Sequence, residues 1–143
     1  MARSCREAAM DYLARREHSR QELYTKLSRK EYMSEVINET LDRLEQQDLL
    51  SDQRFAENFT RHRVNQGYGR LRIRQELRLR GVDDGLVELA LQVWQGQWLE
   101  RAVLQQQKHF GELPTDIKAR AKQTRYLQNR GFDFEVVREV LKN

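Results

Sequence analysis

The chain has 143 residues, with 26 Lys and Arg against 22 Asp and Glu, so its formal net charge of +4 is too small to identify a nucleic-acid binder by itself. Hydrophobic residues make up 38% and charged residues 34%, which is poor in apolar residues for one compact globule but not poor enough for disorder. A single cysteine excludes a disulfide framework, and no apolar run is long enough for a signal peptide or a membrane span. We therefore expect a soluble cytoplasmic protein in a reducing compartment.

Apolar residues recur at spacings of three and four along the chain, without the sustained alternation typical of strands. The pattern predicts an all-α protein in which nine helices are separated by short connections. In chain order we expect helices over 4–17, 19–30, 34–48, 52–66, 69–81, 84–94, 97–110, 115–130 and 133–142.

The ends of these helices have recognisable residues. Ser19 and Glu22 have the spacing of a capping box. Further residues that favour helix starts are Ser34, Ser51, Thr115 and Asp133. Glycine accepts the left-handed conformation at a helix end, which predicts helix stops at Gly67, Gly81, Gly111 and Gly131.

An internal repeat follows from a shift of fifty residues, which superimposes Arg80-Gly81 on Arg130-Gly131 together with the apolar residues that follow. A looser first copy is aligned through the identical segments 20–23 and 74–77, both RQEL, with about four extra residues before the next match. Because units of this size bury little alone, we expect three tandem three-helix modules stacked into an elongated, curved array. The predicted modules are 1–50, 51–96 and 97–143. Chance matching of leucines between helices is the alternative explanation.

Positive charge is concentrated in the middle of the chain, where residues 53–81 contain eight arginines and two glutamates. On the predicted helix 69–81, Arg70, Arg74 and Arg78 are four apart and form a row beside the apolar stripe. The planar guanidinium group binds phosphate or carboxylate in bidentate fashion, so the row predicts contact with an anionic partner. The alternative is an ordinary solvated helix face.

The same interpretation extends to other basic residues near the row, namely Arg61, Arg63 and Arg72. Tyr68 is either a platform for stacking a base or a packing residue. A second, weaker basic helix carries Lys118, Arg120, Lys122, Arg125 and Arg130, and we expect acidic residues of its module to balance it. Of these, Lys118, Lys122 and Arg125 are the candidate contacts to an anionic partner.

No pattern in the sequence predicts an enzyme. The three histidines lack metal-ligand spacing, Cys5 has no nearby histidine and aspartate, and the sequence GYG has neither the third glycine nor the preceding strand of a dinucleotide-binding loop. We therefore predict no catalytic residue, no metal and no cofactor.

Residues 49–82 carry a block of motifs that is more specific than any of these features. They are Arg54-Phe55-Ala56, Gly67-Tyr68-Gly69, Arg72-Ile73-Arg74-Gln75-Glu76-Leu77 and Arg80-Gly81-Val82. The block resembles the RecX family, the regulators of the bacterial recombinase RecA, and segments 16–27 and 124–141 also fit that family. One departure is Arg70, where the family pattern often has proline.

The resemblance implies three three-helix modules and a non-enzymatic protein of DNA repair, homologous recombination and the SOS response. Such a protein binds the RecA–DNA filament and limits its extension, ATP hydrolysis, strand exchange and co-protease activity. The implied partners are the RecA filament and single-stranded DNA, with double-stranded DNA as a further candidate, and we expect a monomer. The alternatives are a helical DNA- or RNA-binding module independent of RecA, and an adaptor for an acidic protein.

Overall fold

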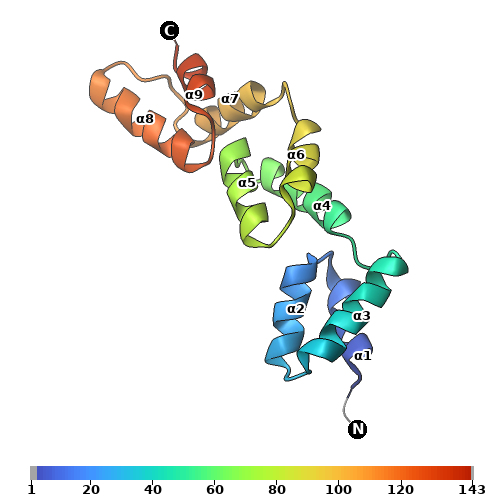
Figure 1. Ribbon diagram of the computed structural model, residues 1–143. Helices are drawn as coiled ribbons and strands as arrows, with labels where there is room; N and C mark the ends of the chain where they lie inside the picture. Colours follow the sequence, from blue (N-terminus) through green and yellow to red (C-terminus); the bar gives the residue numbers. More distant parts are fainter. Residues whose placement is uncertain (1–2, 143) are drawn as a thin grey trace. The chain divides into compact units, whose positions relative to one another are not determined.

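Residues 3–142 are described by a computed structural model, and within this range the chain forms nine α-helices and no strand (Figure 1). Every predicted helix is present, and each predicted boundary lies within two residues of the observed one, so the all-α prediction is confirmed. The helices are α1 (Cys5–Arg15), α2 (Arg20–Arg29), α3 (Ser34–Gln46), α4 (Asp52–Asn65), α5 (Arg70–Leu79), α6 (Asp84–Gln92), α7 (Trp98–His109), α8 (Ile117–Asn129) and α9 (Phe134–Val140). No helix in this range is both long and apolar enough to cross a membrane.

The helices group into two compact units. The first contains the residues up to Asn58 together with Leu77–Val87, and the second contains Phe59–Glu76 together with the residues from Glu88 onward. Helices α4, α5 and α6 therefore contribute residues to both units. The module boundaries at 50/51 and 96/97 stay a prediction.

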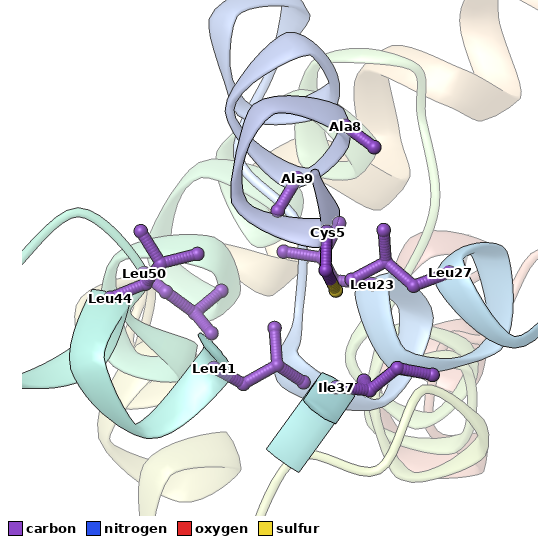
Figure 2. Packing of buried hydrophobic residues seen from close by; sticks show 9 residues of the cluster. All are labelled: Cys5, Ala8, Ala9, Leu23, Leu27, Ile37, Leu41, Leu44 and Leu50. Atoms are coloured by element: carbon purple, nitrogen blue, oxygen red, sulfur yellow. The ribbon is translucent and has the colours of Figure 1, made fainter. Parts of the chain in front are cut away.

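The core of the first unit lies between α1, α2 and α3, as Figure 2 shows. Leu23 and Leu27 are four apart on α2, so both side chains point to one face of the helix and both are fully buried. Small residues on α1, Ala8 and Ala9, allow that helix to approach closely. The only cysteine, Cys5, packs in this core as a free thiol.

The second unit has a core of residues from α7, α8 and α9, including Ala102, Leu127 and Val137. Beside it lies a buried pair of glutamines. Gln106 donates from Nε2 to the Gln123 Oε1 at 3.1 Å, and both amides donate to the carbonyl of Glu112, at 2.8 Å from Gln106 and 3.1 Å from Gln123. Because these buried amides find partners, they fasten the loop between α7 and α8 rather than destabilise the core.

Two of the predicted helix starts are confirmed by capping hydrogen bonds. The Ser19 hydroxyl accepts the backbone N–H of Glu22, and the Glu22 carboxylate accepts the N–H of Ser19, each at 3.1 Å, which is the reciprocal capping box. Ser51 caps α4 by accepting the backbone N–H of Arg54 at 3.1 Å.

Two other predicted caps are wrong. Ser34 is already the first residue of α3, and Met33 occupies the N-cap without a side-chain hydrogen bond. Thr115 precedes the real cap of α8, because the next residue, Asp116, accepts a first-turn N–H at 2.7 Å. A carboxylate at this position also interacts favourably with the helix dipole, which favours Asp116 over its neighbour.

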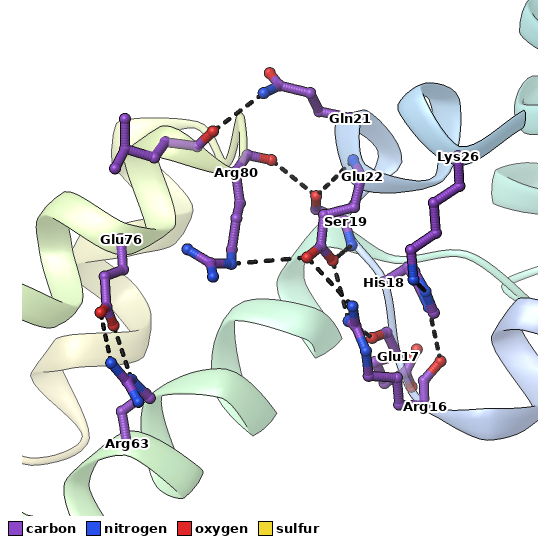
Figure 3. Close-up of polar contacts among 11 residues, drawn as sticks. Arg16, Glu17, His18, Ser19, Gln21, Glu22, Lys26, Arg63, Glu76 and Arg80 are labelled. Atoms are coloured by element: carbon purple, nitrogen blue, oxygen red, sulfur yellow. Dashed lines mark hydrogen bonds and ion pairs between the residues drawn. The ribbon is translucent and has the colours of Figure 1, made fainter. Parts of the chain in front are cut away.

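The repeat has a structural basis in a joint between the start of one helix and the end of another. In the first unit, the Ser19 hydroxyl donates to the carbonyl of Arg80 at 2.8 Å, and Gln21 Nε2 donates to that of Leu79 at 3.1 Å (Figure 3). These bonds join the beginning of α2 to the end of α5.

Fifty residues later the second unit contains the corresponding joint, between the beginning of α5 and the end of α8. Here backbone groups replace the side chains, since the Gly69 N–H donates to the Arg130 carbonyl at 2.7 Å and the Leu71 N–H donates to the Gly131 carbonyl at 2.9 Å. Gly131 has φ +103°, a conformation that side chains disfavour. In the first three helices the corresponding residue is Glu31, at φ +70°.

The shift of fifty residues also holds for the first three helices, without the extra residues expected from the RQEL match. Leu23 and Leu27 are buried on α2 as Ile73 and Leu77 are buried on α5, exactly fifty residues apart. The two RQEL segments occupy different turns of their helices, so that part of the predicted alignment is wrong.

Close approach at the joint predicts a large cost for a single methyl group. In Gly69→Ala the new Cβ would lie 2.5 Å from the carbonyl carbon of Gly131 and 2.6 Å from its oxygen, both of them backbone atoms. We expect a loss of about 2–4 kcal/mol in the free energy of unfolding, measured by urea denaturation.

The matched control is Gly85→Ala. Gly85 lies within α6, where the nearest atom to an added Cβ is a carboxylate oxygen of Asp83 at 3.1 Å, and alanine is favoured over glycine inside a helix by about 1 kcal/mol. This variant should be as stable as the parent or more stable. A Gly69→Ala protein with unchanged stability would contradict the role of the joint.

Candidate nucleic-acid interface

The predicted row of arginines lies on α5, but its charges have partners inside the protein. Arg74 forms a bidentate pair with Glu88 of α6, with Nε and Nη2 donating at 2.9 and 2.8 Å. Arg78 donates from Nε to Asp84 of the same helix at 2.9 Å. The two arginines are four residues apart on α5, and the two acids are four residues apart on α6. The later arginine pairs with the earlier acid, as expected for antiparallel helices joined by a short turn.

The first arginine of the row is paired with a residue far along the chain. Arg70 donates to the carboxylate of Asp133, 63 residues away. Asp133 stands at the N-cap of α9, as predicted, but its side chain makes no capping hydrogen bond there. Arg70 is also the first residue of α5, the position where proline is favoured in helices, so the departure from the family pattern preserves the start of the helix.

These pairs change the interpretation of the row. The sequence suggested three like charges in one row, whereas in the structure each guanidinium pairs with a carboxylate from outside α5. Exposed pairs of this kind contribute little to stability, typically about 0–1 kcal/mol, so a phosphate can replace the carboxylate at small cost. Arg78, whose side chain is 54% exposed, is the most accessible of the three.

A second group of predicted residues is brought together around Glu76. Arg63 reaches from α4 and donates to both carboxylate oxygens, at 2.8 Å from Nε and 2.5 Å from Nη2 (Figure 3). Arg72 adds a weaker bond at 3.3 Å from Nε. Burial acts to raise the pKa of Glu76, but the hydrogen bonds and charges of Arg63 and Arg72 outweigh it and hold that pKa below its usual range.

Tyr68 lies among guanidinium groups. Those of Arg63, Arg130 and Arg72 approach the ring centroid to 3.9, 4.0 and 4.4 Å, within the range of cation–π interactions. The ring thus packs inside the protein, and a base that stacks on it must first displace a guanidinium group.

Among the predicted site residues, those on α8 have uncompensated charge. Lys118, Lys122 and Arg125 are exposed, lie on one stripe of the helix and make no hydrogen bond or ion pair with any residue from 3 to 142. We predicted that acidic residues would balance this helix, which is wrong for these three. Arg120 is different, because it donates to the carbonyl of Leu141 at 2.8 Å.

The remaining predicted residue, Arg61, lies on the exposed surface of α4. Within the described range no group of three or more His, Cys, Asp or Glu side chains is placed to hold a metal ion. The candidate site residues therefore lie on α4, α5 and α8, and the three on α8 have no internal partner within the described range.

Comparison with known proteins identifies the family. Models of the first, second and third three-helix domains of RecX match residues 5–44, 51–91 and 95–141. The chain belongs to the RecX family. Its relatives include the Regulatory protein RecX of Pseudomonas putida (strain W619), which is 46% identical over 139 residues that cover 95% of this chain and 88% of the relative. The Regulatory protein RecX of Pseudomonas entomophila (strain L48) is 44% identical over 137 residues, with the same coverage.

Solved RecX structures have the same fold. The crystal structure of RecX from Lactobacillus salivarius is 23% identical and has a TM-score of 0.83 over 96% of this chain and 92% of that one. A crystal structure described as regulatory protein RecX is 22% identical, with a TM-score of 0.84 over 97% of this chain and 72% of that one. The predicted resemblance and the three-helix RecX domains are thereby confirmed, and which residues bind a partner stays a prediction.

The amino-acid sequence contains one signal that would have revealed the pairs on α5. The arginines at 74 and 78 and the acids at 84 and 88 have matching spacings across a short turn. No local signal reveals the pair of Arg70 and Asp133, because Arg70 lies in the second three-helix domain and Asp133 in the third.

The cluster around Glu76 makes stability depend on pH. Since its pKa is lower in the folded chain than in the unfolded chain, the contribution of Glu76 is present above the ordinary pKa of glutamate, about 4.3, and is lost as pH falls below it. In Glu76→Gln we expect a loss of about 2 kcal/mol at pH 7 in the free energy of unfolding, and this difference should shrink between about pH 5 and pH 3.

The control is Glu39→Gln, at an exposed position of α3 that has no ion pair within residues 3–142. Its stability should stay within about 0.5 kcal/mol of the parent at each pH. If Glu76→Gln behaves like this control at pH 7, the cluster is not a stabilising feature.

Proposed function

We propose that this protein regulates RecA by binding the RecA–DNA filament and limiting its extension, ATP hydrolysis, strand exchange and co-protease activity. The observation that carries the proposal is the similarity to proteins named Regulatory protein RecX, at 44–46% identity over 95% of the chain. The protein acts by binding rather than by catalysis, needs no cofactor and works in the cytoplasm with RecA.

The uncompensated face of α8 supports a contact with the anionic filament. Lys118, Lys122 and Arg125 can each meet a phosphate without breaking an internal bond. The basic residues of α4 and α5 form a second contact, in which phosphates replace the carboxylates of Asp84, Glu88 and the other internal partners. The residues of this contact are Arg61, Arg63, Tyr68, Arg70, Arg72, Arg74 and Arg78. Several weak contacts on one chain give tight binding to a repetitive partner.

The first test is ATP hydrolysis by RecA on single-stranded DNA, titrated with this protein, while binding to the same DNA is measured without RecA. We expect hydrolysis to fall at protein concentrations far below those that cover the DNA, because the protein acts on the filament. Hydrolysis that falls only when the protein coats the DNA would indicate a DNA-binding module independent of RecA. Salt-sensitive binding to RecA in the absence of DNA would indicate an adaptor for an acidic protein surface.

The second test removes the free charges of α8. In the triple variant Lys118→Gln, Lys122→Gln, Arg125→Gln, the concentration for half-maximal inhibition of RecA should rise at least tenfold, since each lost phosphate contact weakens binding by about 1 kcal/mol. Helicity should not change, because all three side chains are exposed and unpaired within the described part of the chain.

The matched control is Arg6→Gln, Arg15→Gln, Arg43→Gln, which removes the same charge from exposed and unpaired positions of α1 and α3. It should change inhibition less than twofold. Equal effects of the two triple variants would mean that net charge, rather than the face of α8, determines binding. Charge reversal of the α5 row is a poorer test, since it would place glutamates against Asp84, Glu88 and Asp133.

A further inference from the structure

A surface pocket of about 380 Å³ lies in the second unit and is lined by residues of α5, α6 and α7. Arg70 and Arg74 line it from α5, Leu91 and Gln92 from α6, and Trp98 from the beginning of α7. Gln95 lines it from the connection between α6 and α7. Two members of the α5 row therefore face the same hollow as an indole ring.

The polar groups of this pocket have unused hydrogen-bonding capacity. Glu88 occupies two of the five N–H donors of Arg74, which leaves three for a ligand. The side-chain amides of Gln92 and Gln95 and the indole N–H of Trp98 have no hydrogen-bond partner among residues 3–142. Neither of the two glutamine side chains is buried, so both can turn toward a bound molecule.

The pocket thus combines three kinds of group that recognise a nucleotide. An indole ring offers a surface for stacking a planar base, which typically contributes about 1–3 kcal/mol per base. Amides supply both donors and acceptors, which match the edges of bases. Guanidinium groups bind phosphate.

We propose that this pocket binds one nucleotide unit of single-stranded DNA, with its base on Trp98, its base edge at Gln92 and Gln95, and its phosphate between Arg70 and Arg74. The proposal deepens the proposed function, because it names the ligand of part of the basic surface. Bases of a duplex are stacked within the double helix and cannot enter, so the pocket selects single strands.

Charge favours a nucleotide unit over an acidic peptide. The lining side chains Arg70, Arg74 and Glu88 sum to +1, and Asp133, which pairs with Arg70 from outside the lining, reduces the positive charge left for a ligand. A nucleotide unit in a strand carries one negative charge and a large uncharged planar base, which suits this balance. A peptide with several carboxylates would place additional negative charge against Glu88.

The fluorescence of Trp98 can report a contact between its indole ring and a base. In Trp94→Phe, Trp98 is the only tryptophan of the chain, and Trp94 does not line the pocket. We titrate this variant with a ten-residue oligothymidylate at low salt and expect strong quenching of indole fluorescence as bases stack on the ring. In the control Trp98→Phe, which retains only Trp94, we expect little quenching. Equal quenching in the two variants, or none in either, would overturn the proposal.

Two further ligands separate the sources of the signal. Thymidine monophosphate at the same nucleotide concentration should quench at least tenfold less than the oligonucleotide, because it lacks the neighbouring phosphates that bind the rest of the basic surface. An acidic peptide, such as a short polyglutamate ending in tyrosine, should not compete with the oligonucleotide. A site that prefers the free nucleotide or the peptide is not the site proposed.

An independent measurement uses the protein with both tryptophans. Gln95→Glu puts a negative charge in the pocket, whereas Gln75→Glu puts the same charge on an exposed position of α5 outside it. In fluorescence anisotropy with a labelled oligothymidylate, the first change should weaken binding at least fivefold and the second less than twofold. Equal effects would overturn the proposal.

Inhibition of RecA is measured for the same variants. If inhibition is retained while the fluorescence and anisotropy results are negative, the pocket fails and the proposed function stands. If the pocket binds the strand but RecA is not inhibited, the pocket stands and the proposed function fails.

Discussion

The structure depends on helix ends that satisfy one another's backbone groups. The first N–H groups of a helix and its last carbonyls have no partner within that helix. At the joint of α5 and α8, Gly69 and Leu71 donate these N–H groups to the carbonyls of Arg130 and Gly131. The positive end of one helix dipole thereby meets the negative end of the other. Such a joint needs little apolar surface, which suits a chain with only 38% hydrophobic residues.

The same geometry determines which charges are available for binding. The joint brings Arg130 to Tyr68, whose ring then contacts three guanidinium groups. The α5 row is paired with two acids of α6 and with the N-cap residue of α9, so the charges of this most basic segment of the sequence have internal partners. The shorter cationic row of α8 has no ion pair among residues 3–142, so its charge is available to an anionic partner.

The sequence predicted those features whose causes are local. Helix ends follow from glycines with positive φ, such as Gly131, and from the Ser19–Glu22 capping box, because each acts within one turn. The predicted repeat alignment was wrong where it matched the two RQEL segments by residue identity. Burial, rather than identity, determines which positions of the repeats correspond. The partner of Arg70 could not be predicted, because Asp133 lies 63 residues away and only the fold brings the two together.

Glu31 makes the end of α2 different from the ends of α5 and α8, where a glycine stands at the corresponding place. An added Cβ would meet the Gln21 side chain at Gly81 and the Arg72 Cβ at Gly131, so both joints have a residue without a side chain at the point of closest approach. Glu31 stands at the corresponding place after α2 and carries a long side chain. A helix start that approached Glu31 by the same bonds would therefore meet a side chain at the place where Gly81 and Gly131 have none.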